Sequence, residues 1–318
     1  MPMYISQQRA PSDNSVSISN GGNSGGEKRG ESVRNSSPRQ NQNLLSWTLE
    51  HTGDAETRKP NVELETTIVL GSVVCCVKFS ADGTKIATGS HSCVKVFEVS
   101  TGKEIFEHRK VITSTDKDAD PYVRAVCISP EGDKVVAVME NNAPRLLSLL
   151  ENGPGPQNLI GHHSEVFSLD WAGNVIASGS ADFQVRLWDS NTCNCKLVLG
   201  NSNGPTDGVT CVALRSDGQL VAAASIDTTI HLWNACNGDL IYRLDSHSES
   251  VYSVVFSMDG SQLISGGLDK TTKVWEIGTD FTSTNAVVPV TLVGHKDFVL
   301  SACCTYDGRY IVSGSKDC

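Results

Sequence analysis

One short phrase returns at a nearly constant spacing and constrains the fold more than any other feature of the sequence. It is clearest at Ile176–Asp189, where two apolar runs flank a polar turn and the second run ends in Trp-Asp. Related phrases occupy residues 221–234, 263–276 and 311–318. The aspartates of the four turns lie 45, 42 and 48 residues apart: Asp182, Asp227, Asp269 and Asp317. A structural unit of roughly 40–45 residues is therefore repeated along the chain.

A second apolar run precedes each phrase, and these runs begin at Val166, Val209, Val251 and Val299. Asp-Gly pairs follow three of them, at 217–218, 259–260 and 307–308. Asp-Gly between two apolar runs favours a hairpin, because glycine adopts positive φ without steric cost. Units of this length that begin near Gly-His and end in Trp-Asp indicate the four-stranded blades of an all-β propeller.

Six repeats follow from this pattern, near residues 74–99, 123–149, 162–189, 209–234, 247–276 and 295–318. In the first, Phe97 stands where tryptophan is expected. In the second, Asn142 replaces the turn aspartate, Ser148 replaces the tryptophan, and Pro144 removes a backbone donor from the third strand, so we expect this blade to be the weakest. The fourth has Pro205 in place of histidine. The sixth ends after its turn, so the sequence predicts about five and a half blades.

The segments outside the repeats differ in composition. Residues 1–45 are rich in Ser, Asn and Gly, and we predict a disordered tail before a propeller domain at 46–318. Trp47–Leu49 and Val62–Thr66 are candidates for an N-terminal strand that closes the last blade. Residues 107–121 and 278–289 are predicted to be surface loops between blades.

Charge and cysteine usage exclude several function classes. A net charge of −10 gives no electrostatic footprint for nucleic acid, so we predict no direct DNA binding. No apolar run approaches the roughly 18–20 residues of a membrane span. Cys193 and Cys195 face no second pair at zinc-site spacing, so we predict no metal and no cofactor. Most other cysteines fall in predicted strands as small buried hydrophobes, which indicates a reducing compartment: Cys75, Cys76, Cys127, Cys211, Cys303 and Cys304.

The polar residues of the repeat resemble those of WD-repeat proteins, in which a loop histidine, a strand serine, the turn aspartate and the tryptophan form a buried hydrogen-bonded chain. The resemblance implies this chain in the third, fifth and sixth repeats and part of it in the fourth: His162, Ser178, Asp182 and Trp188; His247, Ser265, Asp269 and Trp275; His295, Ser313 and Asp317; and Asp227 with Trp233. A catalytic Ser-His-Asp triad is the alternative. Because the set recurs with the blade period, and an active site need not repeat, we assign it to the fold and predict no enzyme.

Several runs also resemble the WD-repeat domain of the fungal Tup-type general transcriptional co-repressor, a Groucho-like family: 72–80, 207–210, 250–256, 294–301 and 313–317. The resemblance covers roughly residues 62–318. It implies a seven-bladed nuclear scaffold that is recruited by DNA-binding repressors and a TPR-repeat partner, and that contacts histones and Mediator. The family's N-terminal helical segment, which tetramerises and binds the TPR partner, has no counterpart here, and the last blade is incomplete. We therefore expect the propeller partners to be retained rather than the TPR contact.

On a propeller of this family, the residue after the inner-strand valine and the residue before the turn aspartate project onto one face. These candidate partner-binding residues are Cys75, Arg124, Phe167, Thr210, Tyr252 and Leu300, then Ala181, Ile226, Leu268 and Lys316, with Tyr122 two residues before Arg124. Exposed apolar residues that gather in one patch mark interaction sites. The alternative is that each aromatic side chain packs against the neighbouring blade.

Two other functions stay open, because a propeller fold does not fix its partners. The chain could be another kind of adaptor, such as a substrate receptor of a ubiquitin ligase or a signalling scaffold. It could also be a non-functional fragment or a decayed paralogue.

Overall fold

The chain folds into antiparallel sheets that follow one another in sequence order. The computed structural model describes residues 66–110, 122–140, 142–278 and 288–317. The first two sheets are β1 (Val74–Phe79), β2 (Lys85–Ser90), β3 (Cys93–Glu98) and β4 (Glu104–Arg109), then β5 (Val126–Ile128), β6 (Lys134–Glu140), β7 (Ala143–Ser148) and β8 (Gln157–Asn158). The third is β9 (Val166–Ala172), β10 (Val175–Ser180), β11 (Val185–Asp189) and β12 (Cys195–Leu199).

The remaining sheets repeat the same order. The fourth is β13 (Val209–Leu214), β14 (Leu220–Ser225), β15 (Ile230–Asn234) and β16 (Leu240–Leu244), and the fifth is β17 (Val251–Phe256), β18 (Gln262–Gly267), β19 (Thr271–Glu276) and β20 (Val290–Val293). The sixth has two strands among the described residues, β21 (Val299–Cys304) and β22 (Ile311–Ser315). The all-β propeller with five full blades and part of a sixth is therefore confirmed. We call the sheets blades 1 to 6.

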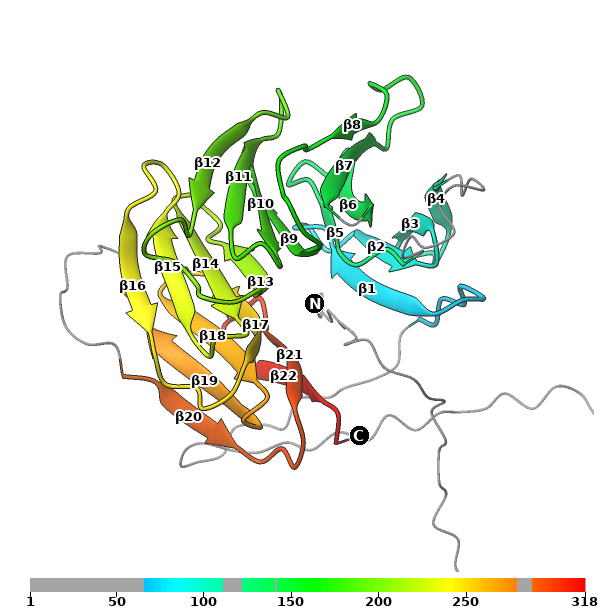
Figure 1. Ribbon diagram of the computed structural model, residues 1–318. Coiled ribbons are helices and arrows are strands. Elements are labelled where there is room, and N and C mark those ends of the chain that lie inside the picture. The colour runs from blue at the N-terminus through cyan, green and yellow to red at the C-terminus, as the bar shows by residue number, and fades with distance from the viewer. Residues whose placement is uncertain (1–65, 111–121, 141, 279–287, 318) are drawn as a thin grey trace, which may run out of the picture. The chain divides into compact units, whose positions relative to one another are not determined.

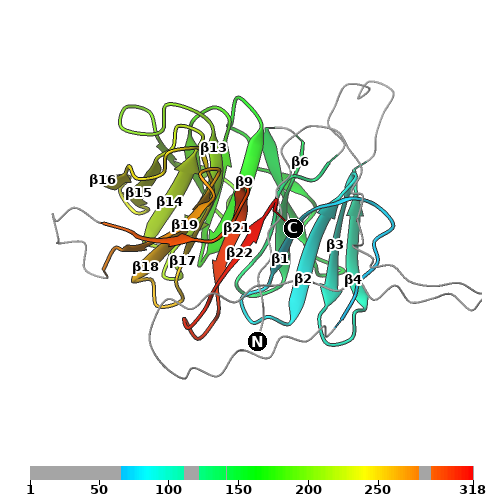
Figure 2. The ribbon, with the colours of Figure 1, turned by 90° about the horizontal axis from the view of Figure 1, so that it is seen from below.

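Each blade packs on the next through its inner part. The first strands of neighbouring blades contact one another, from β1 with β5 through to β17 with β21. Figure 1 shows the blades following one another in chain order from cyan to red, and Figure 2 shows β1 to β4 side by side in their hydrogen-bonded order. All of the described residues belong to one compact unit.

The core consists of layers between blades rather than one central cluster. One cluster joins Leu146 of blade 2 to Ile176 and Trp188 of blade 3, and another joins Leu232 of blade 4 to Trp275 of blade 5. Each tryptophan therefore fills the space toward the preceding blade, because its strand position faces that way. Burial of a whole indole ring between two sheets is a large apolar gain, so the repeated tryptophan stabilises the stacking.

The first turn of blades 1, 4 and 5 forms as the Asp-Gly pattern predicts. Gly83, Gly218 and Gly260 adopt φ values of 70°, 70° and 71°, a region that only glycine enters freely. The preceding aspartate fixes the turn from its side chain. Asp259, for example, accepts hydrogen bonds from the hydroxyl of Ser257 at 2.6 Å and the backbone N–H of Ser261 at 3.1 Å.

Blade 2 departs from its predicted alignment. Leu147, which is 2% exposed, pairs with Val135 as Trp188 pairs with Ile176 in blade 3. Leu147 and not Ser148 therefore occupies the tryptophan position, so the predicted substitution by Ser148 is wrong. The strand pairing shifts register between Val138 and Glu140, and such an irregularity displaces any count made from the turn by one residue.

An ion pair joins two inner strands that are not neighbours. Lys78 Nζ of β1 lies 3.0 Å from Asp170 Oδ1 of β9, although the residues are 92 positions apart in the sequence. The other oxygen of Asp170 accepts the backbone N–H of Leu214 in β13 at 2.7 Å. Burial alone would lower the pKa of Lys78, but the Asp170 carboxylate outweighs it and raises the pKa. Blades 1, 3 and 4 are thus linked through one carboxylate.

Several predictions lie outside the described residues. These are the disordered tail at 1–45, the closing strand at Trp47–Leu49 or Val62–Thr66 apart from Thr66 itself, and most of the loops at 107–121 and 278–289.

Candidate functional site

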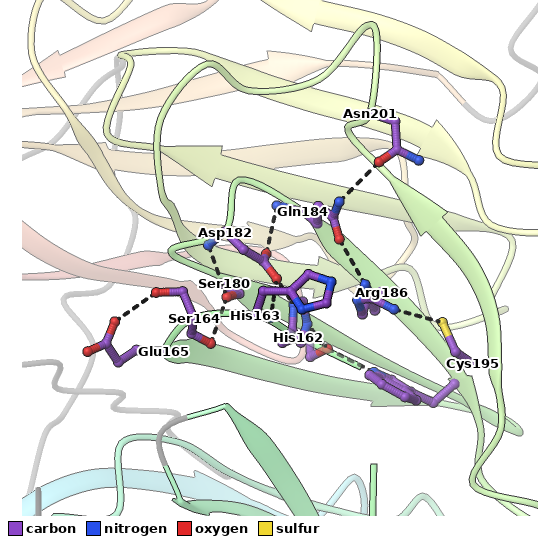
Figure 3. Close-up of polar contacts among 12 residues, drawn as sticks. His162, His163, Ser164, Glu165, Ser180, Asp182, Gln184, Arg186, Cys195 and Asn201 are labelled. Carbon is purple, nitrogen blue, oxygen red and sulfur yellow. Dashed lines mark hydrogen bonds and ion pairs between the residues drawn. The ribbon is translucent and has the colours of Figure 1, made fainter. Parts of the chain in front are cut away.

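The repeated polar residues form one continuous chain inside blade 3. His162 Nδ1 lies 2.9 Å from Asp182 Oδ2, and His162 Nε2 lies 2.7 Å from Ser178 Oγ. The indole N–H of Trp188 donates to the same Ser178 oxygen at 2.8 Å. Figure 3 shows His162 beside Asp182, with His163 and the turn residues around them.

The donors and acceptors of this chain can all be matched. The indole N–H of Trp188 can only donate, so Ser178 Oγ accepts from it. The Ser178 proton is then available to His162 Nε2, and His162 Nδ1–H to the Asp182 carboxylate, which gives every member of the chain a partner. Ser178 is fully buried and His162 is 4% exposed, so no substrate can approach a serine nucleophile here. The geometry supports a structural role.

Blades 5 and 6 repeat the arrangement. His247 lies 2.8 Å from both Asp269 Oδ2 and Ser265 Oγ, and Trp275 donates to Ser265 at 2.9 Å. In blade 6, His295 lies 3.0 Å from Asp317 and 2.8 Å from Ser313. Burial lowers the pKa of His247, which agrees with a neutral ring.

The turn aspartates are held as anions. Burial by itself raises the pKa of Asp182, but hydrogen bonds from His162 and from the backbone N–H groups of His163 and Gln184 outweigh it, and the pKa lies at about 2. A buried carboxylate with this many donors stays charged at neutral pH.

Blade 4 keeps the turn aspartate but lacks the histidine and the serine of the hydrogen-bonded chain. Asp227 accepts the backbone N–H of Thr206 at 2.6 Å and the hydroxyl of Thr229 at 2.6 Å. Ala223 occupies the serine position, and buried His231 stacks on Trp233 with ring centroids 5.4 Å apart. The turn aspartate is therefore kept in every blade from 3 to 6, although its partners change.

The candidate partner-binding residues share a backbone feature that the sequence does not reveal. In five blades the residue after the inner-strand valine is the extra residue of a β-bulge, where the pairing shifts register: Cys75, Phe167, Thr210, Tyr252 and Leu300. A bulge re-aims the side chain of its extra residue and is frequent beside binding sites. We call the surface that carries these residues the bulge face.

The turn residues lie directly beside the bulges. The backbone N–H groups of Ala181, Ile226, Leu268 and Lys316 donate to the carbonyls of Glu165, Gly208, Ser250 and Phe298 at 2.8, 3.0, 2.9 and 3.0 Å. These carbonyls belong to the segments that lead into the inner strands. Both sets of candidates therefore lie at the same end of each blade.

Exposure on the bulge face is uneven. Cys75, Arg124, Phe167, Ala181, Ile226, Tyr252, Leu268 and Leu300 are half-buried, whereas Lys316 and Tyr122 are exposed. Tyr122 stacks edge-on against His91 with ring centroids 5.6 Å apart, and Lys316 lies over the ring of Phe298. Thr210 differs from the expectation, because it is 4% exposed and its hydroxyl donates to the carbonyls of Ala224 and Val251. Thr210 therefore ties two blades together rather than reaching a partner.

Two aromatic residues on the bulge face escaped the sequence analysis. Phe183, which follows the turn aspartate of blade 3, is 43% exposed, and Phe298, two residues before the bulge of blade 6, is 36% exposed. An alignment of the position after each turn aspartate would have singled out Phe183, since the other blades carry Thr228 and Lys270 there.

The described residues give no support for disulfide bonds, a metal site or a membrane-spanning helix. Their ten cysteines carry free thiols, and no group of three or more His, Cys, Asp and Glu among them could hold a metal ion. Within the same residues no helix has the length and apolar character needed to cross a membrane.

Comparison with known proteins agrees with this architecture. The family model described as WD domain, G-beta repeat, matches residues 65–98, 156–189, 193–234, 238–276 and 287–318, which is more than half of the chain. The matches leave out residues 99–155, where the degenerate second repeat lies.

Three curated relatives illustrate the range of similar proteins. The nuclear distribution protein nudF of Aspergillus niger is 31% identical over 49% of this chain and 34% of its own length. Protein tipD of Dictyostelium discoideum is 27% identical over 77% of this chain and 39% of its own. The human F-box-like/WD repeat-containing protein TBL1Y is 34% identical over 38% of this chain and 26% of its own. The chain thus spans less than two fifths of each relative, and the repeat matches with the blade geometry show that it belongs to the WD-repeat family.

Proposed function

We propose that this protein is a non-enzymatic interaction scaffold whose partners bind the bulge face. The observation that carries the proposal is the row of β-bulges at the same end of five blades, four of which carry a half-buried side chain and the fifth the buried Thr210. The propeller fold itself does not require large apolar residues at the bulge positions. Phe167, Tyr252 and Leu300 are half-buried there, with part of each side chain open to a partner.

The specific role that we propose is that of a nuclear transcriptional co-repressor. DNA-binding repressors recruit it through the bulge face, and it contacts histones and Mediator. The support is the resemblance of runs such as 250–256 and 294–301 to the Tup-type family, together with the acidic charge, which favours recruitment by a protein rather than by DNA. A TPR-repeat partner belongs to the same family role.

A second candidate is an adaptor of another kind, such as a substrate receptor. The observation that favours it is the similarity to a relative whose name includes F-box-like as well as WD repeat. Both candidates use the same surface and differ in the partner.

The test is a pull-down of DNA-binding repressors with the full chain and with Tyr252→Ala or Leu268→Asp. We expect each variant to lose most of the bound repressor while its melting transition stays unchanged. Tyr306→Ala is the matched control, because Tyr306 is 59% exposed at the opposite end of blade 6. Undiminished binding by both variants, with intact folding, would remove the bulge face as the recruiting surface.

A further inference from the structure

We propose that the bulge face over blades 3 and 4 binds a partner segment in which an apolar side chain is flanked by lysine or arginine, with Phe183 as its anchor. This inference rests on the proposed function and names the chemistry of the partner at one part of the face.

The first observation is the backbone of Phe183. Its φ is 69°, in the left-handed region that bulky residues avoid at a cost of roughly 1–2 kcal/mol. Thr228 and Lys270, at the same turn position in blades 4 and 5, have φ values of 76° and 67°. The turn therefore imposes the left-handed backbone at this position, but Thr228 and Lys270 show that it does not require an aromatic side chain.

The second observation is that the ring contributes little to the core. Phe183 is 43% exposed, although phenylalanine is usually buried. A side chain that carries both backbone strain and exposed apolar surface weakens the fold locally. Aromatic residues of this kind dominate the binding energy of protein interfaces, so contact with a partner explains the choice.

The third observation concerns the residues around the turn. On one side, Ala181 N–H donates to the carbonyl of Glu165 at 2.8 Å. On the other side lies the connection of residues 200–208: a methyl group on Gly208 would approach Ala181 Cα to 3.5 Å, and one on Gly200 would approach the Phe183 oxygen to 2.8 Å. The turn of residues 181–183 therefore lies between the segment that carries Glu165 and the segment that carries Asp207.

A side-chain hydrogen bond holds this arrangement together. Gln184 Nε2, next to Phe183, donates to Asn201 Oδ1 at 3.1 Å, and the same Gln184 accepts from Arg186 at 3.0 Å. Figure 3 shows this chain from Asn201 through Gln184 to Arg186. The turn of blade 3 and the connection into blade 4 thus form one supported surface.

The fourth observation is charge. Glu165 and Asp207 are both exposed. Their carboxylates accept hydrogen bonds from neutral donors, the hydroxyl of Ser164 and the N–H of Gly208. The guanidinium of Arg186 in β11 contacts Gln184 and Cys195, and neither carboxylate is among these partners. An exposed apolar ring whose two neighbouring segments each carry an exposed carboxylate is complementary to an apolar side chain flanked by cationic ones.

Blade 6 shows that this combination is local. Its equivalent segments carry Lys296, Asp297 and Lys316, and Lys316 lies over the exposed ring of Phe298. The two lysines offset the aspartate there, so charge favours binding of a basic segment over blades 3 and 4.

The experiment is a selection of random short peptides displayed on phage against the full chain, followed by fluorescence anisotropy with the enriched peptides. We expect enrichment of an aromatic or aliphatic residue flanked by Lys or Arg. Phe183→Asn should weaken these peptides by about tenfold or more, and salt should weaken them further. Glu165→Gln with Asp207→Asn should weaken them and reduce the salt dependence.

The choice of asparagine separates binding from folding. Asparagine enters the left-handed region readily, so Phe183→Asn should melt at the same temperature as the wild type or higher while it binds less. Lys270→Asn is the matched control, because it relieves the same conformation in blade 5 without removing the ring.

The outcomes separate this inference from the proposed function. Peptides that depend on Tyr252 but not on Phe183, or that are enriched in acidic residues, overturn the inference and leave the scaffold function standing. Peptides that depend on neither residue overturn both. A loss of binding that Lys270→Asn reproduces also overturns the role of Phe183.

Discussion

Replacement of Ser178 by alanine tests the hydrogen-bonded chain most directly. Its hydroxyl accepts from Trp188 at 2.8 Å and donates to His162 at 2.7 Å, and the residue is fully buried. Ser178→Ala removes both hydrogen bonds and changes the volume by only one oxygen atom. The effect therefore reports on the polar partners rather than on packing.

The expected loss follows from the groups left behind. An indole N–H and an imidazole nitrogen would each be buried without a partner, and each such group costs about 1–3 kcal/mol. We expect a total loss of about 2–6 kcal/mol in the free energy of unfolding, or roughly 4–24 °C in Tm for a domain of this size. Urea unfolding followed by tryptophan fluorescence and by circular dichroism measures the loss and tests whether the blades unfold together.

Matched variants sharpen the measurement. Ser265→Ala in blade 5 breaks the same pair of hydrogen bonds and should cost as much. Ser313→Ala in blade 6 should cost less, because Ser313 is half-buried and its hydroxyl contacts His295 without the tryptophan N–H that Ser178 and Ser265 also bind. Ser164→Ala, which removes a hydroxyl bonded to exposed Glu165, should be nearly neutral. A Ser178→Ala loss below about 0.5 kcal/mol, or an equal loss for Ser313→Ala, would refute the reasoning.

Three further predictions concern charged groups. The pKa of Asp182 is lowered to about 2 from its ordinary value near 3.9, so as pH falls the folded state takes up this proton at a lower pH than the unfolded state does. About 2 kcal/mol of stability is therefore present above pH 4 and is lost as pH falls toward 2. Asp182→Asn should flatten that part of a plot of Tm against pH. Burial lowers the pKa of His247, so the unfolded chain takes up the proton first and stability should already decline as pH falls below about 6.5, a decline that His247→Gln removes. For the partly buried Lys78–Asp170 ion pair, Asp170→Asn should destabilise by about 1.5–3 kcal/mol because Lys78 loses its charged partner. Lys78→Met with Asp170→Asn should cost less than the sum of the single changes, and additive losses in the urea midpoint would contradict the pairing.

The sequence predicted the blades well because their determinants are local. The turn glycines, the alternating apolar runs and the aspartate that caps each turn act within a few residues, so their spacing defines one blade at a time. Alignment failed in blade 2, where a register shift placed Leu147 rather than Ser148 at the tryptophan position. A shift of one residue leaves composition unchanged and becomes visible only in the pairing with the adjacent strand.

The candidate binding residues were harder to judge, because their exposure depends on the adjacent blade. Thr210 and Tyr252 hold the same bulge position, yet Thr210 is buried through a hydrogen bond to Val251 of blade 5, and Tyr252 is half-buried. Phe183 was missed since its importance depends on a left-handed backbone and on the exposure of its ring.

The sequence by itself determined that this protein is a WD-repeat propeller and which serine, histidine, aspartate and tryptophan belong together, because one short period repeats both the strands and the polar residues. Only the tertiary structure decided which side chains reach the bulge face, that Asp170 links blades 1, 3 and 4, and where charge surrounds an exposed ring. Burial and electrostatic pairing depend on neighbours that lie a whole blade or more away in the chain, and no local pattern encodes those neighbours.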